Sequence, residues 1–207
     1  MARPRTPLLS TAAIRDTALR LIDEGGLAEL SMRRLADALG VQPSSLYGHY
    51  ANKDDVLDAV ANLLIAEVDT SGFAHGWRDG LLAWARSYRA VLAAHPNCVP
   101  LIASGTQRRE QFLEMANSVH GGLVGAGWPP RRATEISGAV KYLVIGAAST
   151  PFASGFADDV QVYLDRYPYL TQAHRLRAEA SRIDRDSFEL GLTSLIRGLE
   201  PGPASVG

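Results

Sequence analysis

Polar side chains that carry hydrogen-bond donors are concentrated between Ser31 and Lys53. Hydroxyl, imidazole and ammonium groups can donate to phosphate oxygens. At a base edge, arginine can donate two parallel hydrogen bonds, and a glutamine amide can donate one and accept one. Such side chains are typical of a surface that contacts a nucleic acid. The candidate residues are Ser31, Arg33, Gln42, Pro43, Ser44, Ser45, Tyr47, His49 and Lys53.

These residues divide into those that would specify a base sequence and those that would fix the position of the protein on a duplex. We assign Arg33, Gln42 and Pro43 to base edges, because the guanidinium of Arg33 can donate two hydrogen bonds to a guanine. Tyr47 can pack on a thymine methyl group, donate to a phosphate, or pack on the protein's own surface. The expected phosphate contacts come from Ser31, Ser44, Ser45, His49 and Lys53.

Two short helices joined by a tight turn would position these side chains. Ser31 can cap the first helix and still donate to a phosphate, and Gly40 can adopt the left-handed backbone that ends this helix. Pro43 suits the first position of the second helix, in which Leu46 is the one strongly apolar residue. A helix with a single apolar anchor is better suited to a DNA groove than to burial.

Residues 10–65 resemble the DNA-binding domain of the tetracycline repressor (TetR) family, most specifically in LYGHYANK from Leu46 to Lys53. The C-terminal part resembles the tetracycline repressor's class of C-terminal domain, in Gly105 and Thr106 and in FELGLTSLIRG from Phe188 to Gly198. The N-terminal resemblance is carried by Thr11, Ala18, Gly25, Leu30, Arg33, Leu35, Ala36, Leu39, Gly40, Val41, Leu46, Tyr47, His49, Asn52 and Lys53.

The resemblance implies an all-α protein with two domains. An N-terminal three-helix bundle with a helix-turn-helix would occupy residues 1–58, and a larger helical domain for effector binding and dimerisation residues 59–207. Helical periodicity agrees, since apolar residues recur at helical spacing and no strand-like alternation is found. We expect a first helix from a cap at Thr11 to Gly25 and Gly26, and a break at 69–76. Further helices are expected at 54–68, 77–94, 108–125, 130–149, 170–181 and 185–199.

Composition limits the class of protein. The chain has 207 residues, 46% of them hydrophobic, and a net charge of −1. Residues 1–53 contain seven basic and five acidic side chains, a mild local excess of +2. No apolar run approaches the roughly 18 residues that a membrane-spanning helix needs, so we expect a cytoplasmic protein. The single cysteine, Cys98, is expected to be a small buried apolar residue.

The resemblance also implies a ligand site in the C-terminal domain. The positions that would carry the tetracycline repressor's metal-binding and drug-binding histidines hold Ala103, Tyr142 and Asp69, and Trp84 replaces a key asparagine. Tetracycline is therefore not the expected ligand. We predict an apolar effector pocket, although aromatic residues at helical spacing are equally typical of an ordinary core. Its candidate residues are Trp84, Tyr88, Phe112, Met115, Tyr142, Phe152 and Phe156.

An apolar stripe near the C-terminus predicts either a helix that covers its own core or part of a dimeric four-helix bundle, and the resemblance favours the bundle. The candidate dimerisation residues are Ile136, Val140, Phe188, Leu192, Leu195 and Leu199. Dimerisation would place two reading helices about 34 to 36 Å apart on one face of DNA.

The resemblance therefore identifies a ligand-responsive transcriptional regulator, interpreted as a repressor, that binds a palindromic operator as a homodimer and is released by a small apolar or aromatic effector. The helix at 54–68 would transmit the conformational change from the effector-binding domain to the DNA-binding domain. We expect no cofactor, metal or catalysis: His95 and Cys98 lack a second pair of zinc-like spacing. A helical-bundle enzyme and a protein-interaction module are the alternatives, and an activator or a ligand-independent regulator are alternatives within the family.

Overall fold

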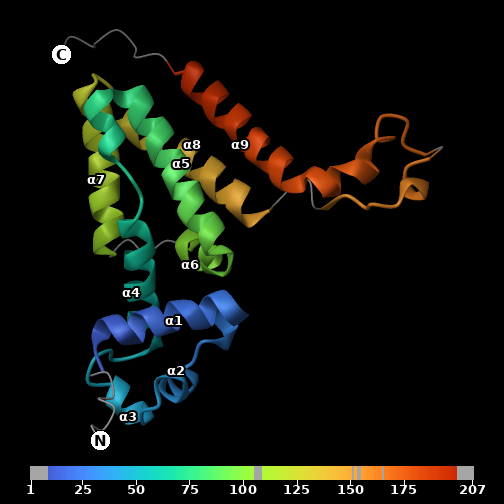
Figure 1. The fold of residues 1–207 in the computed structure, drawn as a ribbon. Coiled ribbons are helices and arrows are strands. Elements are labelled where there is room, and N and C mark those ends of the chain that lie inside the picture. The colour runs from blue at the N-terminus through green and yellow to red at the C-terminus, as the bar shows by residue number, and fades with distance from the viewer. Residues whose placement is uncertain (1–8, 105–108, 151, 153–154, 165, 200–207) are drawn as a thin grey trace, which may run out of the picture. The chain divides into compact units, whose positions relative to one another are not determined.

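The computed structural model describes residues 9–104, 109–150, 152, 155–164 and 166–199. The regular elements in these ranges are α-helices and 3-10 helices, which confirms the predicted all-α class (Figure 1). Gly105 and Thr106, on which part of the family resemblance depends, lie outside the described residues. None of the helices in the described ranges combines the length and the apolar character needed to cross a membrane.

The chain forms two compact units. One is made from Met1–Glu67 and Ala94–Glu114, and the other from Val68–Ala93 and Met115–Gly207. The first unit thus combines the N-terminal helices with a short segment from the middle of the chain. The domain boundary predicted after residue 58 falls inside helix α4 (Lys53–Ala66), and the division into domains stays a prediction.

The N-terminal helices of the first unit enclose a small apolar core. They are α1 (Thr11–Gly25), η1 (Leu27–Glu29), α2 (Met32–Leu39), α3 (Pro43–Leu46) and α4 (Lys53–Ala66). Helix α1 packs against α2 and α4, and α2 packs against α3. Amphipathic helices this short depend on such packing for their stability. The side chains with no exposed surface in this core include Ile14, Ile22, Leu35, Leu46, Val56, Val60 and Leu64.

The start of α1 differs by one residue from the prediction. The backbone N–H of Ala13 donates to Ser10 Oγ at 3.1 Å, so Ser10 is the capping residue and Thr11 is the first helical residue. Both hydroxyl residues are good caps, and the sequence alone does not separate them. The helix ends at Gly25, as predicted, and Gly26 follows with a φ of 83°.

The middle segment contains two elements that the sequence analysis missed, η3 (Pro96–Cys98) and α6 (Val99–Ala103). Pro96 and Pro100 both occupy first-turn positions, where a proline removes no helical hydrogen bond. Cys98 is buried, as predicted. Burial, and secondarily the charge of Asp23, raises the pKa of the Cys98 thiol to about 12.

The second unit is built on long helices. Its elements are η2 (Ser71–His75), α5 (Trp77–Ala94), α7 (Glu110–Gly125), α8 (Pro130–Ser149), η5 (Val160–Val162), η6 (Ala173–Glu179) and α9 (Ala180–Arg197). The predicted ranges of α5 and α8 are confirmed, and α8 packs against α9. The α-helix predicted at 170–181 is wrong: Ala173–Glu179 is a 3-10 helix that leads directly into α9. An apolar spacing of three residues fits both helix types.

Phe73 fixes the close approach of η2 to two helices. Its ring lies against Gly80 on α5 and Gly122 on α7, where an added Cβ would overlap ring atoms. Both positions therefore have to be glycine while the ring stays in place.

Replacing Gly122 with alanine should lower the free energy of unfolding by about 1–3 kcal/mol, because the new methyl group overlaps the Phe73 ring. The adjacent Gly121 is the matched control, since a Cβ there meets nothing within 4 Å. Gly121→Ala should stabilise the helix by up to about 1 kcal/mol. Denaturant unfolding of both variants measures the difference, and equal stabilities would contradict this account of Phe73.

Candidate nucleic-acid interface

The turn between α2 and α3 is fixed by its own backbone. Gly40 has a φ of 67° and a ψ of 32°, the left-handed conformation predicted from the sequence. The N–H of Gly40 donates to the carbonyl of Asp37 at 3.1 Å, and that of Val41 donates to the carbonyl of Ala36 at 3.0 Å. These bonds satisfy carbonyls that the helix end leaves without partners, so the angle between α2 and α3 is set locally.

Side-chain caps hold the first turns of α2 and α4. Ser31 Oγ accepts the N–H of Arg34 at 3.1 Å, and Asn52 Oδ1 accepts the N–H of Asp55 at 3.0 Å. The predicted cap at Ser31 is thereby confirmed. The serine hydroxyl is exposed and keeps its own hydrogen, so the cap leaves it able to donate to a phosphate.

Helix α3 has one buried side chain. Leu46 has no exposed surface, whereas Ser44, Ser45 and His49 are exposed and 55% of Tyr47 is exposed. Gln42, at the N-terminal cap of this helix, is also exposed, and Pro43 is half-buried at its first position. The helix therefore presents polar groups outward around a single anchor, which is the arrangement that the sequence predicted.

The turn after α3 is attached to α1 through Tyr50. The N–H groups of His49 and Tyr50 donate to the carbonyl of Leu46 at 2.9 and 3.0 Å, which continues the helical turn. The Tyr50 hydroxyl then donates to the carbonyl of Thr11 at 3.1 Å. Partial burial raises the pKa of this hydroxyl. Tyr50 thus fixes the turn that follows α3, while the exposed ring of Tyr47 remains free to contact DNA.

The cationic groups near this surface differ in their partners. Arg15 pairs with Asp16, Arg20 with Glu24, and Arg34 with Glu29. Arg33 is exposed and makes no ion pair within the described part of the chain. It is therefore the arginine of α1 and α2 that can approach a base or a phosphate without breaking an existing pair.

Lys53 lies half-buried at the first position of α4. Its ammonium donates to the carbonyl of Leu27 at 3.3 Å. An ammonium has three donors, so this bond leaves two for a phosphate.

The nine predicted DNA-contact residues all lie in the first unit. Eight of them are on or immediately beside α2 and α3, and the ninth, Lys53, is the first residue of α4.

The predicted effector residues fall into separate groups. Trp84 and Tyr88 are buried on α5, with ring centroids 6.3 Å apart, and Met115 is buried on α7. Phe112 is half-buried and belongs to the first unit. The indole N–H of Trp84 is buried without a hydrogen-bond acceptor among the described residues.

The remaining predicted effector residues lie at the surface of the second unit. Tyr142 is 79% exposed and Phe152 64% exposed, and both line a hollow of about 310 Å³ beside α8. The Phe152 and Phe156 rings meet edge to face at 5.1 Å. The structure thus brings Trp84 to Tyr88, Tyr142 to Phe152, and Phe152 to Phe156. The other residues lining the hollow are Leu143, Gly146, Ala147, Thr150, Asp184 and Ser187.

The apolar stripe of α8 and α9 is already covered in a single chain. Ile136, Val140, Phe188 and Leu192 are at most 3% exposed. Leu195 and Leu199 are half-buried, and side chains such as Leu190, at 69%, remain exposed on α9. The burial of the stripe is thus explained by the chain's own core. The dimer interface on these helices stays a prediction, and their exposed faces are the surface that a second copy can reach.

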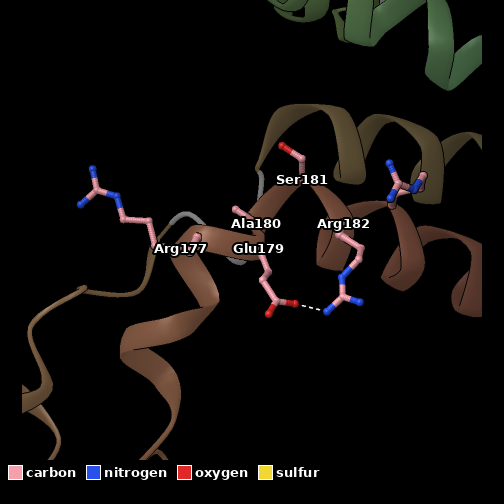
Figure 2. A pocket seen from close by; sticks show the side chains of 7 residues that line it. Arg177, Glu179, Ala180, Ser181 and Arg182 are labelled. Carbon is pink, nitrogen blue, oxygen red and sulfur yellow. Dashed lines mark hydrogen bonds and ion pairs between the residues drawn. The ribbon is translucent and has the colours of Figure 1, made fainter.

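Another hollow, of about 420 Å³, lies where η6 meets α9 and is lined by residues 177–182 and Arg185 (Figure 2). Its arginines have acidic neighbours: Arg177 lies 3.7 Å from Asp158, Arg182 pairs with Glu179, and Arg185 lies 3.9 Å from Asp186. These pairs compensate the positive charge. Among the described residues, no group of three or more histidine, cysteine or acidic side chains is arranged to hold a metal ion.

Comparison with known families agrees with this geometry. Residues 14–60 match the model described as "Bacterial regulatory proteins, tetR family", and residues 73–201 match "Tetracyclin repressor-like, C-terminal domain". The chain belongs to the TetR family. The first match contains α2, α3 and the turn between them, and the second contains the long helices from α5 to α9.

Individual proteins are similar over most of the chain. The class C tetracycline repressor protein of Escherichia coli is 32% identical over 201 residues, covering 93% of this chain and 91% of that protein. An HTH-type transcriptional regulator of Saccharopolyspora erythraea is 35% identical over 146 residues, which are 69% of this chain but 61% of the regulator's own length. The crystal structure of ActR from Streptomyces coelicolor in complex with actinorhodin superposes with a TM-score of 0.76 at 27% identity, covering 97% and 100% of the two chains.

Replacing Arg33 with alanine should cost about 1–3 kcal/mol of binding free energy and relax the base preference at one operator position. Arg34→Ala is the control on the neighbouring residue, because Arg34 is already paired with Glu29. It should leave the base preference unchanged. Titration against single-position operator variants measures both effects, and an unchanged preference in Arg33→Ala would show that this side chain contacts only phosphate.

Proposed function

We propose that this chain is a ligand-responsive transcriptional repressor that binds a palindromic operator as a homodimer and is released by a small apolar or aromatic effector. TetR-family regulators bind DNA operators as homodimers and respond to small molecules. The observation that supports this function most directly is the exposed polar face of α2 and α3, which rests on the single anchor Leu46. This face includes Arg33, which forms no ion pair with any residue that the structure describes.

Dimerisation gives the reading helix its specificity. One helix as short as α3 contacts few base pairs, and two copies related by two-fold symmetry reach major grooves about 34 to 36 Å apart. Tyr47, exposed at the end of α3, would pack on a thymine methyl group or donate to a phosphate. Gly48 stands where the family's best-known member has a large aromatic residue, so this operator should differ in sequence from that of the tetracycline repressor.

The effector site would lie around Trp84 and Tyr88. A buried N–H without an acceptor costs about 1–3 kcal/mol, and a ligand oxygen could remove that cost. This supports an effector that combines an aromatic ring system with a carbonyl or hydroxyl oxygen. ActR, which is similar in fold, has been crystallised with actinorhodin.

Effector binding would weaken DNA binding through a shift between two conformations. The effector would bind better to the conformation whose reading helices are wrongly spaced, and operator affinity would fall by the ratio of the effector's affinities for the two conformations. Helix α4 begins directly after the turn that follows α3, and it would transmit this conformational change to the reading helix. The protein would act in the cytoplasm and without catalysis.

Selection of random duplex DNA by the purified protein near physiological salt tests the proposed function. The selection should enrich a palindrome whose half-sites are about one helical turn apart. Tyr47→Ala is the control and should lose the enrichment. Turnover of a substrate that is unaffected by Tyr47→Ala would instead favour a helical-bundle enzyme, and the absence of salt-dependent DNA binding would favour a protein-interaction module.

Screening would first identify an aromatic carbonyl compound that releases the protein from the selected operator. Trp84→Phe should weaken the release of the protein by this compound. The variant keeps an aromatic ring but removes the buried N–H, so effector affinity should fall by about 1–3 kcal/mol while operator affinity is retained. Trp77→Phe is the matched control on the same helix. Effector titration of the protein–operator complex measures both variants, and equal responses would place the effector elsewhere.

A further inference from the structure

The end of α8 and the first half of α9 form the hollow of about 310 Å³ described above. The two helices lie side by side (Figure 1). They are in close contact at Gly191 of α9, because a Cβ added there would come within 3.2 Å of the Leu143 side chain. At Gly146, one turn further along α8, an added Cβ would meet nothing within 4 Å. The helices therefore touch at Leu143 and leave an open space beside Gly146.

Two aromatic rings line this space and remain largely exposed. Tyr142 lies on α8, and Phe152 lies just beyond the end of that helix. The edge-to-face contact with Phe156 holds the Phe152 ring in its orientation. Isolated exposed rings are normal on a protein surface, but two rings beside one hollow form a surface that a ligand can contact.

The faces of these rings can attract a cation. An aromatic ring has a negative face, and this chain already uses one in that way: the guanidinium carbon of Arg89 lies 4.9 Å from the centre of the Phe188 ring. Within the described ranges, no arginine or lysine is stacked on Tyr142 or Phe152. Both rings can therefore receive a positive group from a ligand.

The charge that lines the hollow is negative. Asp184, half-buried on α9, is the one charged side chain among the described residues that line it. Thr150 and Ser187 add hydroxyl oxygens that can accept hydrogen bonds. A carboxylate can accept several hydrogen bonds, so Asp184 can bind a cation in addition to any partner within the protein.

The other hollow at the start of α9 has the opposite character. Arg177, Arg182 and Arg185 line it together with Glu179 (Figure 2). Three positive groups against one carboxylate repel a positive ligand. Of the two hollows, the one beside Tyr142 is therefore the one that favours a cation.

We propose that the hollow formed by Tyr142, Phe152 and Asp184 binds a small organic ammonium ion, at a site separate from the effector site proposed on α5. The positive group would lie between the carboxylate and the two ring faces, and the hydrocarbon part of the ligand would cover the apolar floor beside Gly146. A metal ion fits less well, because Ca²⁺ and Mg²⁺ require several oxygen ligands and the hollow offers one carboxylate. Such a site would exist whether or not the chain binds DNA.

Calorimetric titration of the full-length protein without DNA, with benzyltrimethylammonium as the probe, tests the proposal. Benzyl alcohol and benzoate carry the same ring with no charge and with a negative charge. Both should bind at least about tenfold more weakly than the probe, because the Asp184 carboxylate attracts only the cation. The affinity for the probe should also fall as the salt concentration rises.

Matched variants identify the groups that bind the probe. Asp184→Asn should weaken probe binding about tenfold, whereas Asp186→Asn, on the same helix but outside the hollow, should change it by less than about twofold. Tyr142→Leu should weaken binding about fivefold and Tyr142→Phe should retain it, because the ring face and not the hydroxyl binds the cation. Tyr169→Leu is the control for Tyr142→Leu, since Tyr169 is almost fully exposed and does not line the hollow.

Gly146→Leu separates occupancy of the hollow from folding. The new side chain enters open space, and leucine has a higher helix propensity than glycine. The variant should therefore lose probe binding while its thermal unfolding midpoint is retained or raised. Unchanged probe binding in Gly146→Leu would place the probe elsewhere and overturn the proposal.

Two results with the unchanged protein would also overturn it. Equal affinities for benzyltrimethylammonium and benzyl alcohol would show that the hollow does not select a charge. Absence of probe binding, together with weaker dimerisation of Tyr142→Leu in sedimentation experiments, would show that a second copy of the chain occupies the hollow. The selection of operator DNA tests the proposed function separately.

Discussion

The surface proposed to read DNA depends on one constraint: α3 is anchored by a single buried side chain. Leu46 is fully buried, and the other side chains of the helix point outward or lie half-buried. One contact cannot fix the orientation of a helix, so the flanking elements must supply the rest. On one side the left-handed Gly40 and its hydrogen bonds set the angle to α2, and on the other the capped start of α4 follows within a few residues. The protein thus gains a polar reading face but makes that face dependent on the position of α4.

The parts of the fold that sequence predicted are those decided by local chemistry. A serine at a helix start, a glycine at a helix end and a proline at a first helical position have few alternative uses, and Ser31, Gly40 and Pro43 all occupy the predicted positions. Prediction was less successful where two structures satisfy the same pattern. Ser10 and Thr11 are equally good caps, and prolines are compatible both with a loop and with the first turn of α6.

The candidate sites were harder to predict because they depend on which surface an apolar residue meets. The aromatic residues predicted as one pocket divide between a buried pair on α5 and an exposed group beside α8. Helical periodicity gives the face of a helix, but not whether that face meets the chain's own core, a ligand or a second copy. The stripe from Phe188 to Leu199 illustrates this, since most of its burial is accounted for within one chain. The hollow beside α8 brings Asp184 of α9 to Tyr142 of α8, and no local pattern indicates this arrangement.

The buried Cys98 has a consequence for the kinds of signal that this protein can register. Oxidants and electrophiles react with the thiolate form of cysteine, and a thiol with a pKa of about 12 is almost entirely protonated near neutral pH. The side chain is also inaccessible, and the sequence contains no second cysteine with which it could form a disulfide within the chain. Cys98 therefore gives peroxides and reactive electrophiles no accessible thiolate to modify. The last residue of η3 is therefore chemically inert toward such reagents in a cell under oxidative stress.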